Sequence, residues 1–360
     1  MNIAKATRRY EKWLGQHTRL VKADLRVKHS RMSDSVFQFL RATYFRWLQI
    51  APRACSSLFA APRVMAVGDV HLENFGTWRD IEGRLIWGMN DFDEASILPY
   101  TNDLLRLAVS ARLASQALVL TLNGKKACEA ISQGYRDSLE VGGQPFVLAE
   151  DHAWLRGIVQ NKLRDPVRFW KRLDALPALR RAVPPEAREA LEYLLPVRGM
   201  PYRVVHRVAG LGSLGRYRLV AIADFHGAQI AREAKATVPP CAGWSESSQP
   251  AQVLCQKIMD QAVRCPDPFF HLRGNWMVRR LSPDCSRVEW QTLPAEQDEL
   301  RLLYSMGWEL GNVHLGSKDA VRAVRRHLSR QPASWLDSAS KAVTKQVIAD
   351  WKAWKKRGEL

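Results

Sequence analysis

The sequence predicts an α+β protein in which a small antiparallel β-rich part lies within a mostly helical chain. Three observations lead to this prediction. Apolar residues follow a helical period over residues 3–50, change to the two-residue alternation of strands after residue 200, and return to a helical period from residue 296. The chain has 360 residues, which is long enough to bury a large core.

Residues 1–60 are expected to be helices, with "MSDS" as a cap before "VFQFLRATYFRWLQI". The apolar run "RVMAVG" predicts a strand that enters a loop, and "LIWGMNDF" predicts another strand after the turn "RDIEGR". Together they form a predicted hairpin at 75–92. A helix over "TNDLLRLAVSARLASQALVL" and further helices to about residue 195 follow, with breaks near Pro145, Pro166 and Pro184. Residues 61–200 are therefore assigned to a helical lobe.

Residues 201–295 are assigned to a β-rich lobe. Its predicted strands are "YRVVHRV", "YRLVAIAD", "AQIAREAKA", "NWMVRRL" and "RVEWQTL". A loop and then a helix are expected over "SESSQPAQVLCQKIMDQAVR". Residues 296–360 are predicted to be helices that complete the helical lobe.

The net charge of +18 is concentrated at the two ends of the chain. Residues 1–53 hold 12 Lys/Arg and 3 Asp/Glu, and residues 316–360 hold 11 and 4. These helices are expected to present solvated basic faces, which also suit an anionic partner such as nucleic acid or a membrane surface. No apolar run is long enough to span a membrane, and the first residues lack the apolar core of a secretory signal. The six cysteines form no CxxC pair, so a cytoplasmic location is expected.

Two polar clusters flank the predicted hairpin. "GDVHLENFG" contains Asp69, His71 and Asn74, and "NDFDE" contains Asp91 and Asp93. Carboxylates that lie close together repel one another, so such a cluster normally holds a divalent metal or has raised pKa values. Because Asp and Asn supply oxygen ligands, Mg²⁺ or Mn²⁺ is favoured over zinc. A metal-free acidic surface patch is the alternative, but Asp69 and Asp91 directly follow apolar strand runs.

The segment "VAGLGSLGR" places Gly210, Gly212 and Gly215 at GxGxxG spacing, with Ser213 between them. A dinucleotide-binding fold needs a helix directly after such glycines, whereas "RYRLVAIAD" alternates like a strand. A glycine loop that joins two strands is instead the phosphate-covering loop of protein kinases. The alternative is an ordinary glycine-rich hairpin turn.

A kinase-like phosphate loop makes further demands, and the sequence meets each of them. It needs a catalytic Asp with an Asn five residues later, which Asp69 and Asn74 provide. It needs a metal-binding Asp after a further strand, and Asp91 has that place. It also needs a cation on a strand after the glycines, for which Arg232 and Lys235 are candidates. Because these two point to opposite faces of a regular strand, only one is expected to reach the phosphates.

The motifs "GDVHLENFG", "NDFDEA" and "NDLLRLA" resemble those of the aminoglycoside and choline kinase branch of the kinase-like superfamily. With "RMSDSVFQFLRAT", "RVAGLGSLG", "REAKA" and "WMVRRL", the series is similar to a bacterial family known as domain of unknown function 2252. The resemblance implies a two-lobed protein-kinase-like fold that binds ATP and Mg²⁺. Asp69 would be the catalytic base. His71 would steady its loop or bind a phosphate, with a satisfied structural histidine as the alternative. Asn74, Asp91 and Asp93 would be metal ligands.

The order of the motifs predicts a circular permutation, because the glycine loop follows the catalytic loop here and precedes it in protein kinases. Two features depart from the kinase pattern. Asp93 replaces the glycine of the DFG motif, and no Glu in "AQVLCQKIMDQA" is available to pair with the cation, so that Glu233 is a poorly oriented stand-in. A nucleotide-binding protein without transferase activity, or one that transfers AMP, is therefore the leading alternative. A metallophosphoesterase and a nucleic-acid-binding module are weaker ones, and the acceptor substrate is undetermined.

Overall fold

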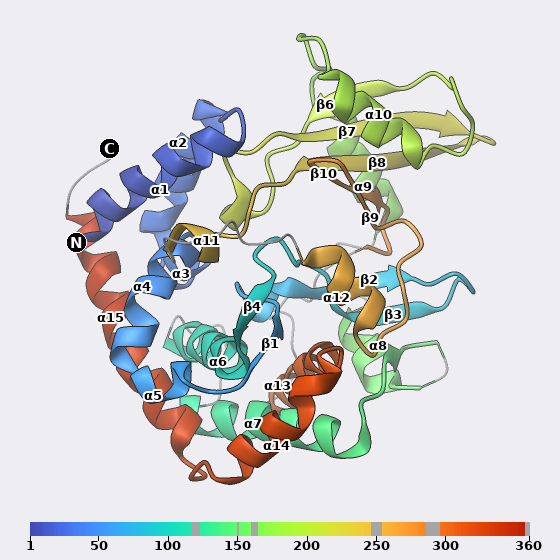
Figure 1. Ribbon diagram of the computed structural model, residues 1–360. Helices are drawn as coiled ribbons and strands as arrows, with labels where there is room; N and C mark the ends of the chain where they lie inside the picture. Colours follow the sequence, from blue (N-terminus) through green and yellow to red (C-terminus); the bar gives the residue numbers. More distant parts are fainter. Residues whose placement is uncertain (117–122, 150, 160–164, 246–253, 286–295, 357–360) are drawn as a thin grey trace.

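A computed structural model describes residues 1–116, 123–149, 151–159, 165–245, 254–285 and 296–356. Helices surround two small sheets in one half of the molecule, and a five-stranded sheet forms the other half (Figure 1). All strand pairs are antiparallel. The prediction of an α+β protein with antiparallel strands is therefore confirmed.

The five-stranded sheet has the strand order β6-β7-β8-β10-β9. Its strands are β6 (Arg203–His206), β7 (Arg218–Phe225), β8 (Ala228–Ala236), β9 (His271–Arg273) and β10 (Trp276–Leu281). Four of the five were predicted from alternation, while the three-residue β9 was not. The predicted strand at 287–293 lies outside the described residues.

The two faces of this sheet differ in what covers them. On the inner face, α9 (Pro166–Asp174) packs Leu173 against apolar side chains of the strands. On the outer face, α10 (Pro185–Tyr193) packs small residues against Leu219, Ala234 and their neighbours. Alternation along β8 therefore turns Glu233 and Lys235 inward, in register with Arg279 and Arg218 on the neighbouring strands. The inner face of the sheet therefore carries charged residues toward one end of its strands and apolar residues toward the other.

The smaller sheets position the two polar loops. Strand β1 (Arg63–Ala66) pairs with β4 (Ser96–Pro99), and β2 (Phe75–Arg79) forms the predicted hairpin with β3 (Leu85–Met89). A third strand, β5 (Phe146–Val147), pairs with β3. Neither β4 nor β5 was predicted, because such short strands depend on their partners rather than on their own sequence pattern.

The helices fall into three groups along the chain. The N-terminal group is α1 (Ile3–His17), α2 (Lys22–Asp34), α3 (Val36–Ala42), α4 (Tyr44–Ala54) and α5 (Ser56–Phe59). The central group is α6 (Tyr100–Gln116), α7 (Gly124–Val141) and α8 (Ala153–Val159), with α11 (Ala242–Ser245) and α12 (Cys255–Gln261) near the sheet. The C-terminal group is α13 (Glu296–His314), α14 (Val321–Ser329) and α15 (Trp335–Lys355).

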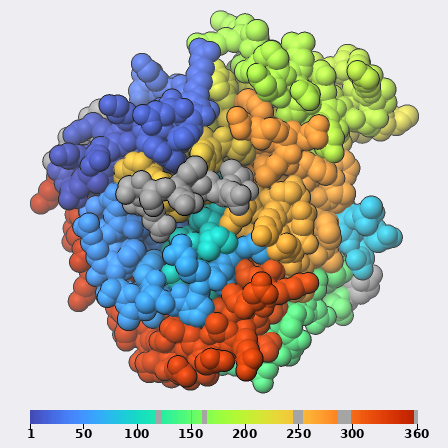
Figure 2. All heavy atoms as spheres, in the orientation of Figure 1, coloured from blue at the N-terminus to red at the C-terminus, as the bar shows by residue number. Residues whose placement is uncertain are grey.

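The two ends of the chain pack together around one large apolar core. Helix α15 contacts α1, α2, α3 and α4, and also α6 and α7. The space-filling view shows the blue N-terminal helices meeting residues of the sheet half along the upper face (Figure 2). Among the described residues, no helix combines the length and apolar character that a membrane crossing needs.

Helices α7 and α13 approach each other closely where both have glycine. A Cβ atom placed on Gly307 would lie 2.1 Å from the carbonyl oxygen of Ile131, and one on Gly134 would lie 1.9 Å from that of Tyr304. Both obstacles are backbone atoms, which cannot move aside as a flexible side chain does. Glycine is therefore required here by close packing of the two helix backbones.

Gly307→Ala is expected to lower the free energy of unfolding by about 1–3 kcal/mol, because overpacking forces the two helices apart. The matched control is Gly157→Ala in α8, where a Cβ would meet nothing within 4 Å. That change is expected to stabilise the protein by roughly 0.5–1 kcal/mol through helix propensity. Urea denaturation measures both, and equal effects of the two substitutions would contradict the packing explanation.

Candidate functional site

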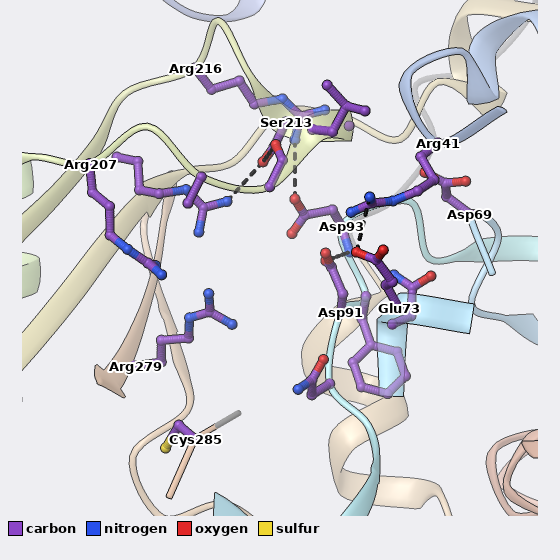
Figure 3. A pocket seen from close by; sticks show the side chains of 18 of the residues that line it. Arg41, Asp69, Glu73, Asp91, Asp93, Arg207, Ser213, Arg216, Arg279 and Cys285 are labelled. Atoms are coloured by element: carbon purple, nitrogen blue, oxygen red, sulfur yellow. Dashed lines mark hydrogen bonds and ion pairs between the residues drawn. The ribbon is translucent and has the colours of Figure 1, made fainter. Parts of the chain in front are cut away.

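A cavity of about 690 Å³ lies between the inner face of the five-stranded sheet and the loops that follow β1 and β3. Its lining includes Asp69, His71, Asn74, Asp91 and Asp93 from the two polar loops, together with Gly210, Gly212 and Ser213. Figure 3 shows Arg207 and Arg279 on one side of the cavity and Asp69, Glu73 and Asp91 on the other. Segments that are far apart in the sequence therefore share one site.

The loop after β1 is held by a buried carboxylate from α6. Asp103 accepts hydrogen bonds from the backbone N–H groups of Val67 at 2.7 Å and Gly68 at 3.0 Å. Gly68 has a φ of +88°, and a Cβ there would lie 2.4 Å from the carbonyl oxygen of Glu94. The loop therefore needs glycine at this position for its backbone conformation and for close approach to the second polar loop.

Asp69 is held in place by a fully buried arginine. Arg106 contacts Asp69 Oδ1 through Nε at 3.1 Å and through Nη2 at 2.5 Å. Burial raises the pKa of Asp69, while Arg106 acts in the opposite direction. The second oxygen, Oδ2, faces the glycine loop, because a Cβ on Gly212 would lie 3.5 Å from it. Asp69 thus has one oxygen fixed and the other directed at the cavity.

His71 and Asn74 form a reciprocal cap within the same loop. The Asn74 Oδ1 atom accepts the His71 backbone N–H at 2.7 Å, and His71 Nδ1 accepts the Glu73 backbone N–H at 3.2 Å. This arrangement begins the short helix η1 (Leu72–Asn74). Both side chains are buried and both line the cavity. Their visible role is to fix the conformation of the loop that carries Asp69.

The second polar loop is held at its start by α13. The buried Glu309 accepts the Met89 backbone N–H at 3.1 Å, at the end of β3. The acidic side chains that follow in this loop differ in their burial and in their partners. Glu94 is buried against Arg216 and the Cys241 backbone N–H, whereas the side chain of Asp91 is 43% exposed.

Asp93 joins the acidic loop to the five-stranded sheet. Both of its carboxylate oxygens lie 2.5 Å from Lys235 Nζ, and Arg216 Nη1 lies 3.6 Å away. Although burial acts in the opposite direction, these cations lower the pKa of Asp93 to about 2. Lys235 also lies 3.7 Å from Asp91 Oδ1. Lys235 therefore contacts the acidic loop from β8, whereas the sequence pattern predicted that one of the two candidate cations contacts the phosphates.

Arg232 lies on the other face of β8, and neither Arg232 nor Lys235 is among the residues that line the cavity. Its Nε donates to the Leu194 carbonyl at 2.8 Å, and its guanidinium stacks over the Phe269 ring. The expectation that Arg232 and Lys235 point to opposite faces is confirmed, and the structure places only Lys235 next to the acidic residues.

The glycine loop is a short helical turn, η3 (Leu211–Ser213), anchored by the N-terminal helices. Lys28 Nζ donates to the Gly212 carbonyl at 2.9 Å, and the Val21 N–H donates to the Gly215 carbonyl at 2.8 Å. Gly215 has a φ of +101°, and a Cβ there would lie 2.4 Å from Leu25. Gly215 therefore packs against α2 rather than lining the cavity, and Lys28 is a site residue that no sequence motif indicated.

A group of arginines on the inner face was also missed by the sequence analysis. Glu233, almost fully buried, accepts from Arg207 Nη1 at 2.6 Å, Arg218 Nη1 at 2.7 Å and Arg279 Nε at 2.8 Å. We call these four residues the Glu233 cluster. The three arginines hold the pKa of Glu233 well below its usual range, against the effect of burial. Alternation along β7, β8 and β10 would have placed Arg218, Glu233 and Arg279 on one face, had the strand order been known.

The oxygen atoms of the acidic side fit a hard divalent cation. Among the described residues no group of three His, Cys, Asp or Glu side chains is preassembled as a metal site, and Asp69, Asp93 and Glu94 each contact a cationic side chain. Asp91 is the exception, since it is exposed and its nearest cation is 3.7 Å away. Its carboxylate and the Asn74 amide oxygen supply the ligand type that Mg²⁺ prefers.

Lys28 gives the site a pH dependence that can be measured. Burial lowers its pKa to about 8, so between pH 8 and the ordinary lysine pKa of about 10.4 the unfolded chain binds more protons than the folded protein. Stability from this group therefore rises with pH in that window. The free energy of unfolding of the wild type, relative to Lys28→Met, is expected to increase by about 2 kcal/mol between pH 8 and pH 10. Urea denaturation at both pH values tests this, and a constant difference would contradict it.

Part of the chain matches a known protein family. Residues 19–154 match the model of a family described as an uncharacterized protein conserved in bacteria (DUF2252). Searches of curated proteins and of solved structures gave no match. The matched segment contains both polar loops and Asp103, and it ends before the five-stranded sheet. The polar loops and the α6 carboxylate that holds one of them therefore lie within the part of this chain that resembles that bacterial family.

Proposed function

We propose that this protein is an ATP- and Mg²⁺-dependent phosphotransferase with a kinase-like, circularly permuted arrangement of its site. The observation that carries the proposal is that the polar loops and the glycine loop face one another in one cavity. Gly212 lies beside Asp69, and Lys235 joins the sheet to Asp93. Neither the polar loops nor the glycine loop is sufficient alone, because acidic side chains must be offset by cations and amides before they can hold a phosphate chain.

Asp69 is the residue we assign as the general base. Its Oδ1 is fixed by Arg106, which leaves Oδ2 directed toward the glycine loop. The burial that raises its pKa brings this carboxylate closer to the range in which a base works at neutral pH. Asp69 would accept the proton of an acceptor hydroxyl as the acceptor oxygen bonds to the γ-phosphorus. The bond from that phosphorus to the β–γ bridging oxygen breaks, and ADP leaves.

Asp91 and Asn74 are the residues that would hold Mg²⁺. The metal would neutralise negative charge on the phosphate chain. The backbone around Gly210 and Gly212 would cover the phosphates, with Ser213 fixed by Arg218, whose Nη2 donates to Ser213 Oγ at 2.8 Å. Positioning and electrostatic stabilisation account for most of phosphoryl transfer, so these groups suffice for the reaction.

The packing of the two ends of the chain supports the permuted order of the motifs. Permutation is physically tolerable when the ends of a domain lie close together. Helix α15, near the C-terminus, packs against α1 and α2, near the N-terminus. Moreover, α13 and α6 hold the starts of both polar loops through Glu309 and Asp103.

One observation favours a second candidate, a nucleotide-binding protein that transfers AMP or transfers nothing. Lys235 is engaged by Asp93 at 2.5 Å, whereas a kinase lysine pairs with a glutamate from a helix. A turnover assay with radiolabelled ATP separates the candidates, because phosphoryl transfer labels the acceptor from the γ position and AMP transfer labels it from the α position.

ATP with Mg²⁺ is expected to raise the melting temperature, since a ligand that binds only the folded state stabilises it by mass action. Asp91→Asn should remove most of the Mg²⁺-dependent part of the shift. The matched control is Asp224→Asn, an exposed carboxylate at the far end of β7, which should leave the shift intact. An unchanged melting curve of the wild type at millimolar ATP and Mg²⁺ would exclude the proposal.

Asp69→Asn is expected to abolish transfer while leaving ATP affinity within a few-fold of the wild type. The base acts on the acceptor, whereas the metal and the glycine loop bind the nucleotide. Calorimetric titration with ATP and Mg²⁺, alongside the turnover assay, provides the measurement. Equal losses of binding and turnover would assign Asp69 to metal binding instead.

A further inference from the structure

We infer that the Glu233 cluster forms a subsite for a doubly charged phosphate group on the sheet side of the cavity. This goes beyond the proposed function, because binding of an anion here requires neither Mg²⁺ nor phosphoryl transfer. The three arginines come from the end of β6, from β7 and from β10, and all of them line the cavity. In Figure 3, Arg207 and Arg279 extend into the cavity opposite the acidic side chains.

The cluster retains donors that point away from Glu233. Arg207 contacts the carboxylate through Nη1, while Arg279 contacts it through Nε and Nη2. Among the described residues, Arg207 Nη2 and Arg279 Nη1 have no protein acceptor. The side chains of these two residues are 32% and 27% exposed, against 6% for Arg218. Arg207 and Arg279 are therefore the pair that presents free N–H groups to a ligand.

The charges of the cluster do not cancel. Three guanidinium groups surround one carboxylate, so two positive charges remain. Burial lowers the pKa of Arg218, and the neighbouring Arg279 and Arg207 lower it further. On the acidic side, by contrast, Lys235 and Arg216 are paired with Asp93 and Glu94. The Glu233 cluster therefore carries an excess of positive charge on the sheet face of the cavity.

A phosphate group matches this excess better than a carboxylate does. Phosphate monoesters carry about two negative charges at neutral pH, which neutralise both remaining charges, whereas a carboxylate neutralises one. Guanidinium forks also fit phosphate oxygens in a bidentate manner. Beyond the arginines the lining becomes apolar at Leu173 and Leu281. The geometry therefore suits a phosphate group attached to an organic body.

Two ligands would supply such a phosphate group to the subsite, namely the phosphate chain of a nucleotide and a phosphate ester on the acceptor. Titration with inorganic pyrophosphate without Mg²⁺, at constant ionic strength, tests the subsite itself. Repeating the titration with protein saturated with ATP and Mg²⁺ identifies the source. Loss of pyrophosphate binding assigns the subsite to the nucleotide chain, and retained binding assigns it to a phosphorylated acceptor. If the wild type binds pyrophosphate but not ATP with Mg²⁺, the proposed function fails while the subsite stands.

Arg207→Gln is expected to weaken pyrophosphate binding by about tenfold or more, as loss of a charge-assisted hydrogen bond does. Glu233 keeps Arg218 and Arg279 in this variant, so the fold should persist, which a melting curve checks. The matched control is Arg203→Gln at the start of β6, the strand that ends just before Arg207, because Arg203 pairs with Asp174 at the surface. Arg279→Gln, with Arg273→Gln as its control, repeats the comparison at the arginine that β10 contributes to the cluster.

The inference is overturned if pyrophosphate does not bind the wild type. It is also overturned if Arg207→Gln and Arg279→Gln bind as tightly as the wild type, or if the controls lose as much affinity as the cluster variants. Arg207→Lys adds a further criterion. It retains the charge but loses the fork, so it should bind more tightly than Arg207→Gln and more weakly than the wild type.

Discussion

The buried ion pair between Lys235 and Asp93 is the contact on which the arrangement of the site depends. It joins residues 142 positions apart, one on the five-stranded sheet and one on the loop after β3. Removing two charges from water is costly, and the cost is offset only when the geometry is good and other partners are present. Here both carboxylate oxygens are engaged and Arg216 is a second cation. A shift of the sheet relative to the polar loop would leave buried charges unpaired, so the pair fixes the shape of the cavity.

This constraint separates the cavity into two electrostatic regions. Because Lys235 and Arg216 are committed to Asp93 and Glu94, they contribute little free positive charge, and Asp91 remains exposed on the acidic side. The Glu233 cluster, by contrast, has three guanidinium groups for one carboxylate. An elongated ligand that carries a divalent cation at one end and a phosphate group at the other matches both regions. The cations that sequence motifs indicate and the cations that are available to a ligand are therefore different residues.

The sequence predicted those features that depend on local pattern. The alternation of apolar and polar residues predicted β8, and it placed Arg232 and Lys235 on opposite faces of that strand. The offset between Asp69 and Asn74 marked one loop, and the apolar run before Asp91 marked the other. Features that depend on strand order were missed, since the register of Arg279 with Glu233 joins segments that one sequence does not relate. Lys28 was missed for the same reason, because its contact with Gly212 spans 184 positions and follows no motif.

Glu233 explains how three arginines remain together when no ligand is bound. Without a carboxylate among them, their mutual repulsion and the cost of burial would spread them apart or expose them. With Glu233 at their centre, each side chain is held in one orientation, and the loss of side-chain entropy occurs on folding rather than on binding. A phosphate group would then meet donors that are already oriented. Because Glu233 carries one negative charge, the net charge of the cluster is two positive charges rather than three. Two positive charges match the two negative charges of one phosphate monoester. Glu233 thus sets both the geometry and the charge of the ligand that the inner face of the sheet accommodates.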